Sequence, residues 1–401
     1  MSQQNFDYDV SIIGGGPGGS TAGYLLSKLG LNVQIIDKDI FPRQKLCGGI
    51  ITFKTLDLLN RLYKETTETL LDKKIINYHT NRFEINYKVK RIMSINISKF
   101  PFYLVDRRVY DNFLLNKAKE AGVDVIEGNE VKKVNLDTCE INLSKGDKFK
   151  AKLIIGADGA NSIVKQEFIR KGIIRKSRWN YNLATGLECF IDRKNLEKGL
   201  FKYPMISFGF LRYGYNWLFP NKNQVIVGVG GLNRKNKGLF KRALNRFITA
   251  LKINPDVVSR VSGHPIPYGN FHITPIYKNK IILIGDAAGI ADPFWGEGIY
   301  YTQKTAEYAS LAILKNLKNF KNFKNSAILY LRLLSKYMYS ELRYALKLRW
   351  LIFNPINTFF NYYPTHLMLK LMRNKLIDIT QGIRSYRWGL KKFFKLGTYL
   401  Q

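Results

Sequence analysis

The sequence predicts a mixed α/β (α+β) chain: a Rossmann-like domain, an antiparallel β-sheet domain and a C-terminal helical region. Three observations support this prediction. Apolar strand patterns flank a glycine turn and a helical pattern near the start, short aromatic and β-branched runs fill the middle, and helical periodicity occupies residues 299–350. Strands that alternate with helices indicate a parallel sheet, whereas consecutive short strands indicate an antiparallel one.

The N-terminal segment has the pattern of a βαβ unit. Residues 8–13 predict a short buried strand, 20–29 a helix and 32–36 the next strand, with a glycine turn at 14–19. Gly30 follows the predicted helix directly, where glycine commonly ends a helix. These elements are the start of a parallel sheet.

Later segments first repeat this pattern and then depart from it. Residues 107–121 predict a helix and 123–126 a strand, and apolar runs at 152–156 and 280–285 each end beside an aspartate and a glycine. Residues 182–230 contain runs such as MISFGF and VIVGV, which favour an antiparallel sheet.

The expected domain boundaries follow these changes of pattern. We assign residues 1–170 and 275–325 to the Rossmann-like domain, with an insertion near 80–103. Residues 171–274 are expected to form the antiparallel domain that holds the substrate, and 326–401 the helical region. A chain of 401 residues is long enough for two hydrophobic cores.

The chain is strongly basic. Its 64 lysines and arginines exceed its 30 acidic residues, giving a formal net charge of +34, and residues 301–401 alone hold 18 basic and 3 acidic residues. Such a field can attract nucleic acid, an anionic membrane surface or an acidic protein partner. A compositional bias toward Lys, Asn and Ile explains the excess as well, so the four explanations stay open at this point.

The cysteines and the N-terminus bear on the compartment. Cys47, Cys139 and Cys189 have no spacing typical of a disulfide framework or a metal site, which favours a reducing cytoplasm and no bound metal. The N-terminus is polar rather than signal-like, and no apolar run approaches the ~20 residues of a spanning helix. We expect a cytoplasmic protein, either soluble or peripheral on the inner face of the membrane.

A glycine-rich turn gives the first indication of chemistry. Gly14, Gly16 and Gly19 form G-x-G-x-x-G between the predicted strand and helix. In dinucleotide-binding folds these glycines make the turn, admit a pyrophosphate and let the helix pack on the strand. Asp37 ends the next strand about 20 residues on, where a carboxylate accepts hydrogen bonds from ribose. The pattern predicts a dinucleotide site but does not separate FAD from NAD.

Two later segments resemble the FAD-dependent superfamily typified by para-hydroxybenzoate hydroxylase. They are IGADGA at 155–160 and IGDAAG at 284–289. In that superfamily the later aspartate, here Asp286, meets the ribityl chain of the flavin, and the earlier segment approaches the cofactor. The resemblance therefore implies FAD.

Further segments are similar to the geranylgeranyl reductase family. FPRQKLCGG at 41–49 resembles its F-P-R-x-K-x-C-G-G segment, and YNWLFP at 215–220 its Y-x-W-x-F-P box. Residues 106–111 resemble its D-R-x-x-F-D pattern and 292–299 its loop after the second aspartate. The similarity spans about three quarters of the chain. Arg212 stands where the family usually has proline, which suggests a different rim for the polyprenyl chain.

The resemblance implies a reaction and the residues that serve it. The chain is expected to use FAD to saturate double bonds of geranylgeranyl or other polyprenyl chains on membrane lipids. The implied FAD contacts are Gly14, Gly16, Gly18, Gly19, Asp37, Cys47, Gly48, Arg107, Val131, Asp286, Gly298 and Ile299. The implied substrate contacts are Tyr215, Trp217 and Phe219, and the expected catalytic residues are Cys47, Tyr215 and Trp217.

Several alternatives remain open from the sequence. Electrons would come from NADPH or from reduced ferredoxin, an acidic electron-carrier protein that a basic surface would attract. The proton donor would be Cys47, a tyrosine or a bound water. An FAD-dependent monooxygenase or halogenase is the alternative enzyme, although a halogenase would have W-x-W-x-I-P where this chain has Tyr215 and Phe219. No specific nucleic acid is expected as a partner, although a non-enzymatic basic binding protein is a further alternative.

The C-terminal region suggests a role at a membrane surface. Residues 327–353 interleave apolar and basic residues at near-helical spacing, and 358–395 add aromatic residues among further lysines and arginines. This mixture is typical of helices at the headgroup boundary. The alternative is a helical domain packed on the rest of the protein with its charges in solvent.

Overall fold

The computed structural model describes residues 6–97, 100–197, 199, 201–271, 276–316, 323–353, 372 and 375–389. The chain forms two compact units, each assembled from three separate stretches. The parallel-sheet unit comprises residues 1–45, 107–183 and 266–340. The antiparallel-sheet unit comprises residues 46–106, 184–265 and 341–401.

The parallel-sheet unit is built on one large sheet. Its strands are β1 (Tyr8–Ile13), β2 (Val33–Ile36), β8 (Asp124–Ile126), β9 (Val131–Val134), β10 (Glu140–Leu143), β11 (Lys148–Gly156), β17 (Tyr277–Lys278) and β18 (Ile281–Leu283). The order is β17-β18-β11-β1-β2-β8, with β10 paired to β11 and β9 paired to β10. Val10 pairs in parallel with both Leu153 and Val33. All three side chains are buried, as the apolar runs of a covered parallel sheet require.

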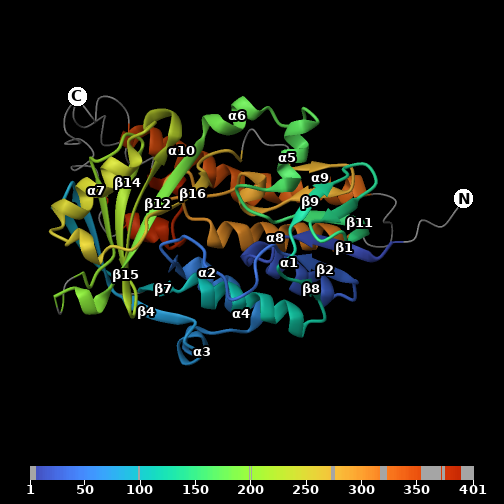
Figure 1. Ribbon diagram of the computed structural model, residues 1–401, viewed down its shortest axis with the longest axis horizontal. Helices are drawn as coiled ribbons and strands as arrows, with labels where there is room; N and C mark the ends of the chain where they lie inside the picture. Colours follow the sequence, from blue (N-terminus) through green and yellow to red (C-terminus); the bar gives the residue numbers. More distant parts are fainter. Residues whose placement is uncertain are drawn as a thin grey trace, which may run out of the picture. The chain divides into compact units, whose positions relative to one another are not determined.

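The same unit also contains helices. They are α1 (Pro17–Ser27), α4 (Arg107–Glu120), α5 (Ile163–Arg170), α6 (Lys176–Tyr181), α8 (Ile299–Leu314) and α9 (Phe323–Leu334). Of these helices, α1 and α5 contact the sheet directly, and α1 also packs between α4 and α8 (Figure 1). Pro17 occupies the first turn of α1, where its missing N–H costs no hydrogen bond. The glycine turn therefore lies between the end of β1 and the N-terminus of a packed helix.

The antiparallel-sheet unit contains two sheets. The larger one consists of β5 (Arg82–Tyr87), β6 (Lys90–Asn96), β12 (Leu183–Asp192), β13 (Met205–Phe208), β14 (Gly214–Pro220), β15 (Gln224–Leu232) and β16 (Ser262–Pro267) in the order β16-β12-β15-β14-β13-β5-β6. The smaller one has the order β3 (Ile50–Ile51), β7 (Phe102–Val105), β4 (Ile76–Thr80). The helices are α2 (Phe53–Tyr63), α3 (Thr67–Asp72), α7 (Phe240–Ala250) and α10 (Ser340–Phe353).

Strand β14 has two different faces. Leu218 lies in a hydrophobic core with Leu244 and Phe247 of α7. Because side chains alternate along a strand, Tyr215, Trp217 and Phe219 lie on the opposite face. The sheet thus separates an apolar core under α7 from an aromatic face.

The fold class predicted from the sequence is confirmed, but the division of the chain differs from the expected boundaries, and two of the differences follow from particular contacts. Residues 46–106 belong to the antiparallel-sheet unit, because β5 pairs with β13 and continues that sheet. Residues 326–340 belong to the parallel-sheet unit, where the Tyr330 hydroxyl donates to the Leu283 carbonyl oxygen at 3.2 Å. Pairing between distant segments determines both differences.

The C-terminal helices bury their apolar sides. Tyr330, Leu334, Leu342 and Leu348 are at most 1% exposed. The apolar residues of 327–353 are therefore largely inside the protein, as in the alternative of a packed helical domain. The sequence could not distinguish the two alternatives, because helices that face a core and helices that face a membrane have the same apolar spacing. The predicted interfacial residues Phe359, Phe360, Tyr362, Tyr363, Phe393 and Phe394 lie outside the described residues. Among the described helices, none has the length and apolar character needed to cross a membrane.

Candidate functional site

The glycine turn forms a tight cradle at the N-terminus of α1. Gly14 has φ of +104°, which glycine adopts at little cost, and a Cβ there would lie 2.6 Å from the Ala157 carbonyl oxygen. A Cβ on Gly19 would lie 1.8 Å from the Gly14 carbonyl oxygen. Gly16 precedes α1 with no side-chain cap. Backbone N–H groups at such a helix start are donors for an anion, as the motif predicts.

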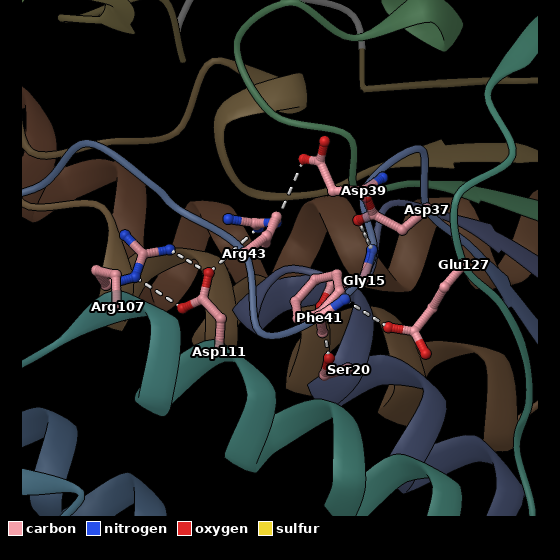
Figure 2. Close-up of polar contacts among 9 residues, drawn as sticks. All are labelled: Gly15, Ser20, Asp37, Asp39, Phe41, Arg43, Arg107, Asp111 and Glu127. Carbon is pink, nitrogen blue, oxygen red and sulfur yellow. Dashed lines mark hydrogen bonds and ion pairs between the residues drawn. The ribbon is translucent and has the colours of Figure 1, made fainter. Parts of the chain in front are cut away.

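Asp37 is held at the end of β2, directly beside this turn. Its carboxylate accepts the Gly15 N–H at 2.6 Å and the Asp39 N–H at 2.9 Å (Figure 2). Burial raises the pKa of this carboxyl group, and the two N–H donors oppose that rise. Each carboxylate oxygen keeps a second acceptor site, so the group fits hydrogen bonds from ribose hydroxyls.

Arg43 is a site residue that sequence analysis did not select. Its Nη2 lies 3.2 Å from Asp111 Oδ2, and its Nε lies 3.7 Å from Asp39 Oδ2 (Figure 2). The same Nη2 would be 3.4 Å from a Cβ on Gly16. Arg43 Nη1 is buried and has no hydrogen-bond partner. A buried donor beside the start of α1 fits the oxygens of a pyrophosphate, which guanidinium groups bind well.

Arg107 is fixed by a two-point ion pair. Its Nε and Nη2 lie 2.7 and 2.8 Å from the two oxygens of Asp111, whose side chain is fully buried (Figure 2). Asp111 thus holds both Arg43 and Arg107. The D-R-x-x-F-D pattern is explained physically by this arrangement, since arginine and aspartate one helical turn apart meet on one face of α4.

Asp286 lies in a 3₁₀ turn, Gly285–Ala288, that directly follows β18. Its Oδ1 would be 3.5 Å from a Cβ on Gly298, which precedes the first residue of α8, Ile299. Burial raises the pKa of Asp286, while the positive charges of Lys45, Arg107 and Lys165 lower it. The structure therefore brings together Asp286, Gly298 and Ile299, three of the predicted cofactor contacts.

Two buried ionisable residues complete this part of the unit. Asp158 follows β11 beside Gly14, accepts the Ile163 N–H at 2.6 Å, and has a buried Oδ1 with no hydrogen-bond partner. Lys165 lies over the Trp179 ring, 4.1 Å from its centroid, and burial lowers the pKa of Lys165 to about 8. No motif pointed to Lys165, because its contact with the ring of Trp179 depends on how α5 and α6 fold.

These observations fit a dinucleotide in the parallel-sheet unit. Gly14, Gly16 and Gly19 form the cradle, Arg43 offers an unsatisfied cationic donor, and carboxylates lie at the ends of β2 and β18. Carboxyl ends of parallel strands are where such folds bind ligands. Gly18 lies in the first turn of α1, packed on α8. Val131 begins β9 with a buried side chain, and its predicted backbone contact stays a prediction.

The second predicted group lies in the antiparallel-sheet unit. A Cβ on Gly48 would lie 2.2 Å from Cδ2 of Phe219, so the backbone of the C-G-G segment rests on the ring of the aromatic box. Cys47 is partly buried, and its Sγ accepts the Gly49 N–H at 3.5 Å. The predicted residues Cys47, Gly48 and Phe219 therefore form one local surface.

The aromatic residues of β14 follow one another along its face. The ring centroids of Tyr215 and Trp217 are 5.9 Å apart, and those of Trp217 and Phe219 are 6.4 Å apart. The Trp217 indole N–H donates to Oε1 of Glu188 at 3.2 Å, and Glu188 is 3% exposed. A Cβ on Gly228 would lie 2.3 Å from Trp217. Glu188 was not predicted as a site residue, because no motif surrounds it within β12.

Comparisons with known proteins identify relatives of this arrangement. Residues 7–180 match the family described as FAD binding domain. The chain is 33% identical over 308 residues to an uncharacterized protein of Methanosarcina barkeri, covering 76% of this chain and 73% of that protein. It is 29% identical over 331 residues to the geranylgeranyl diphosphate reductase of Rhodobacter capsulatus, covering 76% and 74%.

Two further comparisons concern a lipid-modifying enzyme and a solved structure. The chain is 28% identical over 330 residues to the digeranylgeranylglycerophospholipid reductase of Methanosarcina acetivorans, covering 76% of this chain and 74% of that protein. A geranylgeranyl bacteriochlorophyll reductase-like protein from Thermoplasma acidophilum has a similar fold, with a TM-score of 0.77 and 20% identity over 97% of this chain and 99% of its own.

Proposed function

Because the chain belongs to the geranylgeranyl reductase family of FAD-dependent oxidoreductases, we propose that it saturates carbon–carbon double bonds of geranylgeranyl or other polyprenyl chains. The observation that supports this most directly is the contact between Gly48 and Phe219. This contact joins the C-G-G segment and the aromatic box. These two motifs resemble the geranylgeranyl reductase family in particular, rather than FAD-dependent hydroxylases in general.

The residues of the parallel-sheet unit are proposed to hold FAD. The turn at 14–19 and Arg43 would bind the pyrophosphate, Asp37 the adenosine ribose and Asp286 the ribityl chain. Arg107 is held in place by Asp111 and adds positive charge near Asp286. The assignments of Cys47, Gly48, Val131, Gly298 and Ile299 to FAD remain proposals of the same kind.

The residues of the antiparallel-sheet unit are proposed to act on the alkene. The chemistry that bound, reduced FAD supplies is hydride transfer to one carbon of the double bond. The chain must deliver a proton to the other carbon, and an isolated trisubstituted alkene then develops positive charge on its tertiary carbon. The aromatic faces of Tyr215 and Trp217 stabilise such charge. An apolar surface around them keeps water away from it.

Cys47 is the proposed proton donor. Its sulfur accepts the Gly49 N–H, so the S–H hydrogen stays available for donation. The Tyr215 hydroxyl and a bound water are the other candidates. Phe219, in contact with Gly48, is proposed to line the path of the polyprenyl chain with Trp217.

The substrate and the electron donor are inferred at the level of chemical class. Relatives of this chain are named for a geranylgeranyl diphosphate and for a digeranylgeranylglycerophospholipid. We favour a membrane lipid, and therefore a cytoplasmic protein that works on the inner face of the membrane. NADPH and reduced ferredoxin, an acidic carrier, are the two donors to compare.

A single-turnover experiment tests this function. Protein loaded with FAD is reduced with dithionite without oxygen and mixed with detergent-dispersed digeranylgeranylglycerophospholipid or geranylgeranyl diphosphate. Mass spectrometry should find two hydrogens added per double bond. A product that gains oxygen or halogen after admission of air would instead identify a monooxygenase or halogenase. Substrate that stays unchanged while the reduced flavin persists would refute the reductase assignment.

A further inference from the structure

The outer side of α7 forms one wall of an open groove in the antiparallel-sheet unit (α7 is yellow in Figure 1). Ala243, Leu244, Phe247 and Ile248 turn one side of α7 into the core. The opposite side is exposed and faces Lys88 and Val89, which follow β5. The groove has a volume of about 830 Å³ and is lined by Lys88, Val89, Phe210, Gly238, Lys241, Arg242, Asn245, Arg246, Thr249 and Ala250.

The charge of this groove has one sign. Lys88, Lys241, Arg242 and Arg246 line it, and no acidic residue does. No ion pair between these four residues and a described acidic residue is found. The sequence accounts for this, because between Glu197 and Asp256 there are eleven lysines and arginines and no aspartate or glutamate. Four exposed cations without acidic neighbours attract phosphate groups.

Exposed aliphatic side chains lie next to these cations. Val89, which lines the groove, is 41% exposed, and Leu239, directly before α7, is 45% exposed. Exposed aliphatic residues among lysines and arginines suit the boundary between headgroups and acyl chains, where cations meet lipid phosphates. A purely electrostatic site for a soluble anion would not require the aliphatic residues.

We propose that this groove docks the protein on the phosphate headgroups of an anionic bilayer. The choice of a bilayer over a soluble anion rests on the proposed function, since a polyprenyl lipid must be taken from a membrane. The exposed Val89 and Leu239 beside the cations favour the same choice.

The test compares two charge-reversed forms of the full chain carrying FAD. One is Lys241→Glu/Arg242→Glu/Arg246→Glu in the groove. The control is Lys133→Glu/Lys145→Glu/Lys148→Glu on β9 to β11, which makes the same change of net charge at exposed positions. Binding to vesicles of phosphatidylcholine, with or without phosphatidylglycerol, is measured by sedimentation at several salt concentrations.

The wild type should bind only vesicles that contain phosphatidylglycerol, and more weakly as salt increases. Because each cation near an anionic surface strengthens binding about fivefold, loss of the three cations and their reversal to Glu should weaken binding by more than about 100-fold, while the control keeps most of its affinity. Equal losses in the two variants would mean that net charge alone matters and would overturn the proposal. Absence of wild-type binding at low salt would overturn it as well.

Two further measurements are needed. The first distinguishes lipid headgroups from a soluble phosphate compound, and the second distinguishes failure of the docking proposal from failure of the proposed function. Free glycerol phosphate, at the concentration of the exposed lipid phosphate, should not displace the vesicles; displacement would assign the groove to a soluble phosphate compound. Single turnover with detergent-dispersed lipid should be the same in both variants and the wild type. If reduction fails in all three while vesicle binding differs as expected, the reductase assignment is lost and the docking surface stands.

Discussion

The main chain of Gly48 lies directly on the ring of Phe219, so closely that a Cβ at position 48 would be 2.2 Å from Cδ2. No side chain fits in this space unless the ring moves. The contact joins residues 171 positions apart, one from the C-G-G segment and one from the aromatic strand β14. It gives a direct test of whether the two motifs act together.

Gly48→Ala is expected to displace Phe219 and to destabilise the protein by about 1–3 kcal/mol, the usual cost of overpacking. The rate of alkene reduction should fall by a larger factor than the affinity for FAD, since Gly48 is one of many proposed FAD contacts. Urea unfolding measures the loss of stability, and flavin absorbance measures the FAD content and the rate of reduction. Adding Phe219→Leu should recover part of the stability, because the smaller side chain makes room. Additive losses in the double variant would show that the two residues are not coupled.

Asp37→Ala and Asp286→Ala are each expected to weaken FAD binding roughly 10- to 100-fold, the effect of losing a hydrogen bond to a charged group. Flavin fluorescence during titration of the flavin-free protein measures the affinity. Asp256→Ala, a change at an exposed acid in the antiparallel-sheet unit, is the matched control. Unchanged flavin occupancy in both site variants would contradict the assignment of this site.

Cys47→Ala should retain FAD and slow alkene reduction about 100-fold, a typical contribution of a general acid. The rate is measured in single turnover with reduced flavin. Cys47→Ser keeps a hydroxyl donor of lower acidity, so its rate should lie between the rates of the wild type and of Cys47→Ala. Equal rates in all three proteins would return Cys47 to a packing role.

Glu188→Leu removes the acceptor of the Trp217 indole N–H and should cost about 1–3 kcal/mol of stability. Reduction should slow, because Trp217 is no longer held in one orientation. Glu188→Gln keeps an acceptor of the same shape and should recover most of both losses. A rate for Glu188→Gln as low as for Glu188→Leu would indicate that the negative charge, rather than the position of Trp217, is what the reaction needs.

Local sequence pattern was sufficient for much of the fold. The predicted strand at 8–13 is β1, and the predicted helix at 107–121 is α4 to within a residue. These elements are recognised by their own apolar spacing. Residues 46–106 could not be assigned in this way, because their place depends on the pairing of β5 with β13, about 120 positions later.

The same limit applies to the candidate site. The glycine turn and Asp37 stand out because fixed spacing along the chain sets their geometry. Glu188 reaches Trp217 only because both flank β15, where they pair with the same residue, Gly228. Lys165 of α5 lies over the ring of Trp179 in α6. Spacing cannot reveal such residues, since the fold and not the motif makes them neighbours.

The way the chain passes back and forth between the units has a consequence for synthesis on the ribosome. β1 ends at Ile13, but β18, which completes the parallel part of its sheet, begins only at Ile281. Neither unit is a continuous segment, so neither can finish folding before most of the chain has emerged. Early strands must wait with unpaired edges, a state prone to aggregation. Fragments that end before β18 should therefore be insoluble, and chaperone demand during translation should be high.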